Sequence, residues 1–256
     1  MRRRLAAVAG ALLGLVATTA APSGAAELKV LTAGAFKQVL VAALPAFEQR
    51  TGHTVTLDNA TVGVLIQRIE GGEAFDVAVL SPAAIDALTA KGKIAAGTRK
   101  ALAKVGVGVV VKAGAPKPDI ATVDAFKRAL LDAKSVAYID PAAGGSSGIY
   151  IAKLLKQLGV ADAVNAKAKL IQGGAVADHI AAGEAELGLH QISEILPVAG
   201  VTLVGPLPAA LQNYTVYAAG ISSAARDRAA AEALIDQLAG PAGAAVITAK
   251  GMEPAS

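Results

Sequence analysis

Short apolar runs alternate along the first third of the chain with longer stretches whose apolar residues recur at helical spacing. The short runs predict β-strands and the longer stretches predict helices. The predicted strands and helices of this part are, in chain order, residues 27–32, 36–50, 54–58, 64–72, 75–80 and 83–92. A strict alternation of strand and helix indicates a parallel sheet covered by helices.

Turn-forming residues mark the ends of these helices. Gly52 is placed to end the first helix, and Ser81 followed by Pro82 is typical of a helix start. Pro45 lies inside the first helix, where it removes a backbone donor. It therefore predicts either a kink or the loss of the last turn.

The remaining two thirds of the chain repeat the pattern between two long apolar strands. Residues 105–119 run from an apolar strand into a segment rich in Pro and Gly, and residues 213–221 form a second long strand. The strands and helices between them are predicted at 135–140, 148–159, 168–174, 175–183 and 185–191, and the last helices within 222–251. Two crossing strands imply an α/β fold of two lobes, each a mainly parallel sheet flanked by helices. The predicted boundaries are 27–109 and 215–256 for the first lobe and 110–214 for the second.

The first 26 residues have the layout of a secretory signal peptide. Three Arg at positions 2–4 precede an apolar stretch at 5–17, and the sequence SGAA offers small residues at a cleavage site after Ala25 or Ala26. The apolar stretch is shorter than the ~20 residues that a membrane span needs. We therefore expect an exported, periplasmic protein whose leader is removed. The leader does not specify the export route.

The composition and charge of the chain limit the kinds of partner that it can bind. Three of the 24 basic residues and none of the 20 acidic residues lie in the leader, so the chain that remains is close to neutral. It contains no Lys/Arg cluster interleaved with aromatic residues, which argues against a nucleic-acid partner. The chain has no Cys, so a core rich in Ala, Val, Leu and Ile must hold the exported protein together. We expect a monomer.

The loop before the helix at 148–159 contains the sequence GGSSG, residues 144–148. It fits the G-x-S-x-G pattern of a serine hydrolase, with Ser146 as nucleophile, and it also fits a loop whose backbone N–H groups bind an anion at a helix start. Residues 141–143 separate the strand from this motif, and no HGGG-type oxyanion loop precedes it. The hydrolase is therefore disfavoured, and an ordinary cap by Ser146 or Ser147 without a ligand is a third interpretation.

The three histidines, His53, His179 and His190, do not form a metal-binding array. None is spaced as in H-x-x-x-H, and no thiolate is available, so we expect neither a metal site nor a cofactor. Glu186 and His190 follow Ser146 in the order of a hydrolase triad, but a chain of this length commonly offers such a pair. His190 is predicted to end a strand near the crevice, and Gln191 beside it offers an amide to a ligand.

Several stretches together resemble one family. The segments LKVLTAGAF, LIQRIEGGEAFDVAVLSP, DPAAGGSSGIY and GEAELGL are similar to those of the periplasmic molybdate-binding proteins of ABC importers. The resemblance covers nearly all of the chain after the leader. It implies the type II periplasmic binding protein fold, a small anion held between hinged lobes, and delivery to a permease in the inner membrane.

The resemblance also assigns ligand contacts, and several positions depart from the family pattern. Ala35 and Val62, the latter preceded by Thr61, stand where the family has serines, and Gln191 stands where it has a tyrosine. The helix-start contact falls on Ser147, between Ser146 and Gly148. A backbone contact falls on Gly173.

These departures leave two binding functions open. Backbone N–H donors remain in every loop, so the chain is predicted to bind a small anion such as a molybdate-like oxyanion, without catalysis. Ser146, Ser147 and Gln191 would equally suit a small organic carboxylate or another polar solute. The third function, from a different class, is the exported hydrolase that uses Ser146.

Overall fold

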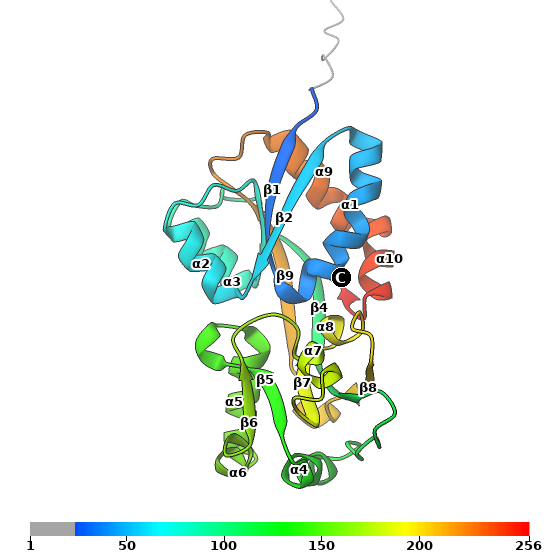
Figure 1. Cartoon of the computed structure of the whole chain (residues 1–256). Helices are drawn as coiled ribbons and strands as arrows, with labels where there is room; N and C mark the ends of the chain where they lie inside the picture. Colours follow the sequence, from blue (N-terminus) through cyan, green and yellow to red (C-terminus); the bar gives the residue numbers. More distant parts are fainter. Residues whose placement is uncertain (1–23, 256) are drawn as a thin grey trace, which may run out of the picture.

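The computed structural model describes residues 24–255, so nearly all of the predicted leader lies outside the described residues. The chain forms two lobes that are connected by the long strands β4 (Lys100–Lys112) and β9 (Tyr214–Ile221), as Figure 1 shows. One mixed sheet runs through both lobes in the order β2-β1-β3-β9-β4-β7-β5-β6.

The first lobe is built on three parallel strands, β1 (Glu27–Ala33), β2 (Thr54–Ala60) and β3 (Val77–Leu80). β9 joins this sheet antiparallel to β3, and β4 joins antiparallel to β9. The short strand β10 (Glu253–Pro254) also pairs with β4. The helices of this lobe are η1 (Gly34–Phe36), α1 (Lys37–Thr51), α2 (Val62–Glu70), α3 (Pro82–Ala90), α9 (Arg228–Ala239) and α10 (Pro241–Ala249).

The second lobe repeats this plan with strands β5 (Val136–Ile139), β6 (Ala168–Ile171), β7 (Leu187–Gln191) and β8 (Val201–Pro206). β5 pairs in parallel with β6 and β7, whereas β7 and β8 pair antiparallel with β4. Its helices are α4 (Val123–Asp132), η2 (Pro141–Ala143), α5 (Ser146–Gln157), α6 (Ala161–Asn165), α7 (Val176–Ala181), α8 (Ile192–Ile195) and η3 (Ala209–Leu211).

The alternation of side chains along each strand explains how aliphatic residues cover both faces of the sheet in each lobe. Neighbouring residues of a strand point to opposite faces. In β1, Val30 packs into the cluster under α1 and α9, while Leu31 packs into the cluster under α2 and α3. Val109 and Val110 of β4 divide in the same way between the two clusters of the second lobe. The sheet is therefore covered on both sides in each lobe, which suits parallel strands.

Most predicted elements are confirmed within a few residues, with three kinds of exception. α1 runs through Pro45 as a single helix and ends at Gly52, so the predicted loss of its last turn is wrong. Pro45 and Val41, whose carbonyl loses its partner, are both exposed, so water can replace the missing bond. The predicted loop 59–63 is shorter, because β2 extends to Ala60 and α2 begins at Val62. Finally, α4, α6, α8, β8 and β10 were not predicted.

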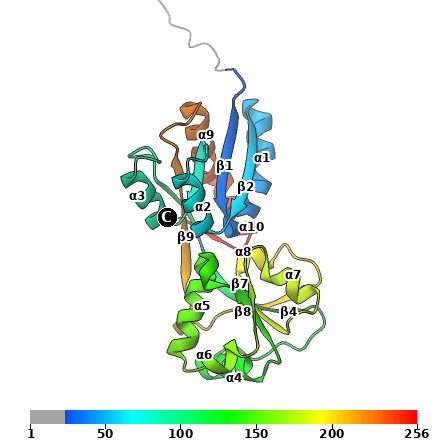
Figure 2. The same ribbon diagram turned by 60° about the vertical axis from the view of Figure 1, so that its left-hand side comes forward.

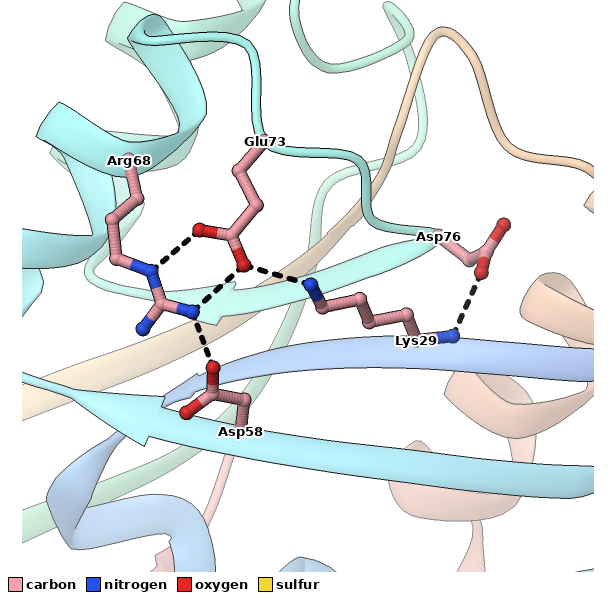
Figure 3. A network of polar contacts seen from close by, with 5 residues as sticks. All are labelled: Lys29, Asp58, Arg68, Glu73 and Asp76. Carbon is pink, nitrogen blue, oxygen red and sulfur yellow. Dashed lines mark hydrogen bonds and ion pairs between the residues drawn. The ribbon is translucent and has the colours of Figure 1, made fainter.

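A network of charged side chains ties the surface of the first lobe together (Figure 3). Arg68 of α2 binds Glu73 through Nε at 2.5 Å and through Nη2 at 2.7 Å, and it also pairs with Asp58 of β2. Lys29 of β1 reaches Glu73 at 2.8 Å and donates its backbone N–H to Asp76 at 2.7 Å. Arg68, followed by Lys29, lowers the pKa of the Glu73 carboxyl to about 2. These contacts fix α2 against the sheet and so position its N-terminus.

The two lobes touch at a pair of glycines. The Gly63 N–H of α2 donates to the Gly144 carbonyl at 3.4 Å, and the Thr61 hydroxyl donates to the Ala143 carbonyl at 2.5 Å. A Cβ on Gly63 would lie 3.1 Å from the Gly144 Cα, which is too close for ordinary packing. Figure 2 shows α2 above the start of α5 at this contact. The approach of the lobes thus depends on the absence of a side chain at Gly63.

We predict that Gly63→Leu prevents this closed arrangement, because the new side chain must displace Gly144. The chain has no Cys, so spin labels can be placed on Gln67→Cys in the first lobe and Ile149→Cys in the second, both exposed. Pulsed electron resonance should show that the shortest distances of the parent chain disappear. Gly173→Leu, where a Cβ meets no atom within 4 Å, is the control. Identical distance distributions for Gly63→Leu and the parent would contradict this account.

Candidate functional site

A cavity of about 280 Å³ lies where the two lobes meet, and we call it the inner chamber. Both lobes supply its walls, the first through the loops after β1 and β2 and the second through the loops after β5, β6 and β7. The residues that line it are Ala33, Gly34, Ala35, Asn59, Ala60, Thr61, Val62, Val64, Ile139, Gly145, Ser146, Ser147, Gln172, Gly173, Gly174, His190, Gln191, Glu194 and Tyr217. These loops follow the carboxyl ends of strands, as expected for a ligand crevice in an α/β fold.

The structure brings seven of the eight predicted contact residues to this chamber. They are Ala35, Thr61, Val62, Ser146, Ser147, Gly173 and Gln191. The exception is Gly148, which is buried and does not line the chamber. A Cβ on Gly148 would lie 2.2 Å from the Ile139 carbonyl oxygen, so this glycine allows α5 to pack on β5. Contact between the seven residues and a ligand stays a prediction.

Two helices of eight residues or more begin at the chamber wall. α5 starts with Ser146 and Ser147, and α2 starts with Val62. The predicted serine cap of α5 is wrong, because the capping position is Gly145 and no side chain caps this end among the described residues. The backbone N–H groups of its first turn, together with the positive end of the helix dipole, favour an anion.

The Thr61 hydroxyl already forms two hydrogen bonds within the protein. Its Oγ1 accepts the Val64 N–H at 3.3 Å and donates to the Ala143 carbonyl across the lobes. Thr61 therefore caps α2 and joins the two lobes, although it lines the chamber. Ala35 has a similar second function, since its carbonyl accepts the Ser193 hydroxyl of α8 at 2.9 Å.

Ser146 lacks the surroundings of a hydrolase nucleophile. The 3₁₀-helix η2 separates the end of β5 from Ser146, so the strand does not turn sharply into the serine. The Nε2 of His190 faces Glu194, and its Nδ1 has no hydrogen-bond partner within residues 24–255. Neither ring nitrogen of His190 is therefore hydrogen-bonded to Ser146.

The chemically distinctive group of the chamber is the Glu194 carboxyl, which sequence analysis missed. It projects from α8, only 16% exposed, and its Oε2 lies 3.3 Å from the buried His190 Nε2. A Cβ on Gly34 would lie 2.7 Å from Glu194 Oε1, so the carboxyl packs against the backbone of the first lobe. Burial raises the pKa of Glu194 to about 8, opposed by the nearby Lys37 ammonium, and lowers the pKa of His190 to about 3. Near neutral pH both groups are mainly uncharged.

The floor of the chamber is formed by Gln191 of β7 and Tyr217 of the crossing strand β9. Gln191 Nε2 donates to the Thr215 hydroxyl at 3.0 Å and lies 3.5 Å from the Tyr217 hydroxyl. Burial, and to a lesser extent Glu194, raises the pKa of the Tyr217 phenol. Within residues 24–255, Gln191 Oε1 and His190 Nδ1 are the buried side-chain atoms that lack a hydrogen-bond partner. Such atoms are uncommon in folded proteins, and here both belong to residues of one chamber.

Tyr217 supplies a phenol to the chamber, although Gln191 replaces the tyrosine of the family pattern. A phenol does line the chamber, but it comes from β9 and not from the end of β7. Glu194 had a weak sequence signal, since it follows His190 by four residues. Neither position falls in a loop that the strand pattern marks as a ligand loop.

Residues 24–255 offer neither a metal site nor a membrane-spanning helix. They contain no group of three or more His, Cys, Asp or Glu side chains arranged to hold a metal ion. No helix in this part of the chain is long and apolar enough to cross a bilayer.

Comparison with known proteins identifies the family. The model of the family described as bacterial extracellular solute-binding protein matches residues 28–253. Aconitate isomerase from Pseudomonas sp. is 35% identical over 253 residues, covering 96% of this chain and 94% of that protein. The molybdate-binding protein ModA from Azotobacter vinelandii is 29% identical over 255 residues, covering 97% and 96%.

Solved structures agree at the level of the fold. The A. vinelandii periplasmic molybdate-binding protein superposes with a TM-score of 0.77 at 24% identity, covering 90% of this chain and all of that one. The sulfate-binding protein SubI from Mycobacterium tuberculosis H37Rv superposes with a TM-score of 0.72 at 19% identity, covering 90% and 88%. The type II periplasmic binding protein fold predicted from the sequence is thereby confirmed, and the chain belongs to the bacterial extracellular solute-binding proteins.

Proposed function

We propose that the inner chamber binds a small organic polycarboxylate and that the protein is the periplasmic capture component of an ABC importer. The observation that carries this proposal is the presence, in one chamber, of the N-termini of α5 and α2 together with the Glu194 carboxyl of α8. Because the Gly63 and Val64 N–H groups of α2 already bind the Gly144 carbonyl and the Thr61 hydroxyl, most donors come from α5. The helix N-termini suit a carboxylate of the ligand, and the Glu194 carboxyl, when protonated, donates a hydrogen bond to a further oxygen. Of the two ligands expected from the sequence, this proposal favours the alternative, a small organic carboxylate, over the molybdate-like oxyanion.

The size of the chamber supports an organic ligand. A single water claims ~30 Å³ of liquid, so a five-atom oxyanion would occupy only part of about 280 Å³. The hydroxyls expected for an oxyanion are absent at Ala35 and Val62, and the Thr61 hydroxyl is bound elsewhere. A larger acid fills more of this space and reaches the polar floor at Gln191 and Tyr217.

The charges of the chamber support an anion that is held without a fixed counter-charge. No Lys or Arg is found among its lining residues. Backbone N–H groups and helix dipoles would therefore carry most of the neutralisation. An ionised Glu194 would repel an anion, whereas its raised pKa keeps it mainly protonated below about pH 8. The similarity to aconitate isomerase, whose name indicates a tricarboxylate, points in the same direction.

We predict that tricarboxylates stabilise the protein and molybdate does so less. Thermal unfolding of the mature chain should be measured with trans-aconitate, tricarballylate, glutarate, sulfate and molybdate. A ligand at a hundred times its dissociation constant adds ~2.7 kcal/mol to the free energy of unfolding, which gives a clear rise in melting temperature. Stabilisation by molybdate or sulfate, with none by the organic acids, would show that the polycarboxylate assignment is wrong.

A second function is favoured by the pair Glu194 and His190. Removal of a proton from the methylene group of trans-aconitate, movement of the double bond and return of a proton to the other carbon yields cis-aconitate. Atoms and electrons balance without an oxidant or reductant. A carboxyl whose pKa lies near the working pH is suited to both proton transfers, and nearby helix N-termini would stabilise the negative charge that develops. This reaction would make the protein an isomerase on a solute-binding scaffold, against the expectation of a protein without catalysis.

We predict that Glu194→Gln separates the two functions. In D₂O the parent should convert trans-aconitate to cis-aconitate with deuterium entering the methylene group, as followed by NMR. The variant should lower this rate by about 10²- to 10⁴-fold, the usual contribution of an acid–base residue, and still bind tricarballylate, which has no double bond to move. Glu232→Gln on the exposed side of α9 is the matched control. Binding of tricarballylate without conversion of trans-aconitate by the parent would leave capture as the function.

A further inference from the structure

A second cavity of about 480 Å³ adjoins the inner chamber, and we call it the outer chamber. The two share four lining residues, Gly34, Asn59, Gly174 and Glu194. The other residues that line the outer chamber are Lys37, Gln38, Ala175, Asp178, Ala181, Pro197, Val198 and Ala199. The Glu194 carboxyl thus faces both chambers, and a ligand that extends from one to the other passes beside it.

Lys37 distinguishes the outer chamber from the inner one. It is the one Lys or Arg among the lining residues of either chamber. It lies half-buried in the first turn of α1 and forms no ion pair with any residue of 24–255. Its charge is felt at Glu194, whose pKa it lowers against the larger effect of burial. A partly buried ammonium without an acidic partner is a ready contact for an anionic group.

We propose that the outer chamber is a second anion subsite, in which Lys37 binds a distal carboxylate of the same ligand whose first carboxylate lies at the helix N-termini of the inner chamber. The inference rests on the proposed function and deepens it. It makes Lys37 the residue that selects acids with two separated carboxylates. A four-oxygen ion is too small to contact both subsites at once.

The other polar groups of the outer chamber are consistent with a carboxylate bound at Lys37. Gln38 and Asn59 lie on the same lobe as Lys37 and offer amide donors. Asp178 of α7 faces the chamber from the second lobe and is exposed. It repels a carboxylate, so the distal carboxylate should lie on the Lys37 side. Glu194, between the subsites, is placed beside the carbon chain that links the two acid groups.

The test compares two probes that differ in one charged group. Glutarate has a carboxylate at each end, and its monoamide glutaramate replaces one of them by a neutral amide of the same length. Titration calorimetry on the parent should show tighter binding of glutarate, by about tenfold or more, as expected for a charge-assisted hydrogen bond. Lys37→Gln should remove most of that preference, whereas Lys153→Gln, an exposed charge on α5, should retain it.

Asp178→Asn supplies a second measurement that does not depend on the folding of the Lys37 variant. It should increase the preference for glutarate, because it removes a repulsive charge. An unchanged preference in Lys37→Gln, or a decreased preference in Asp178→Asn, would overturn the second subsite. Tight binding of tricarballylate by a parent that does not distinguish glutarate from glutaramate would overturn the subsite and spare the proposed function. Failure of the parent to bind any of these acids would overturn both.

Discussion

The burial of the Glu194 carboxyl at the junction of the lobes is the constraint around which the site is arranged. The carboxyl packs against Gly34 of one lobe while its own helix belongs to the other, so it is desolvated when the lobes approach. Burial raises its pKa to about 8 from an ordinary 4.5. Because the folded chain retains a proton that the unfolded chain loses, the free energy of unfolding falls as the pH rises through this interval. Such a cost is typical of a functional site.

Much of the fold could be read from local patterns. Alternating apolar runs located β1, β2, β3, β5, β7 and β9, and turn residues such as Gly52, Ser81 and Pro82 located helix ends correctly. Most elements that were missed are short, although α4 has ten residues. α8 has four residues, too few to show a helical period, and β10 has two. The prediction at Pro45 was wrong because the solvent exposure that makes this residue tolerable is a tertiary property.

The site was only partly accessible to the same reasoning. Loops after strands could be recognised, and they led to Ser146, Ser147 and Gln191. Glu194 could not be placed, because its surroundings come from Gly34 and Lys37, which are far away in the sequence. The motif GGSSG correctly located the start of α5 at the chamber. The expected serine cap was wrong, since Gly145 occupies the capping position. Under the proposed function, a residue outside the loops recognised from the sequence would give this solute-binding scaffold a different ligand chemistry.

The most direct test of this account is a carbon NMR titration of the glutamate carboxyls in the mature chain, with the Glu194 signal assigned by its absence in Glu194→Gln. The titratable groups that share a chamber with this carboxyl are His190, Tyr217, Lys37 and Asp178. The account predicts that Glu194 titrates near pH 8 and is protonated at neutral pH. A midpoint near 4.5, as for an exposed glutamate, would contradict it.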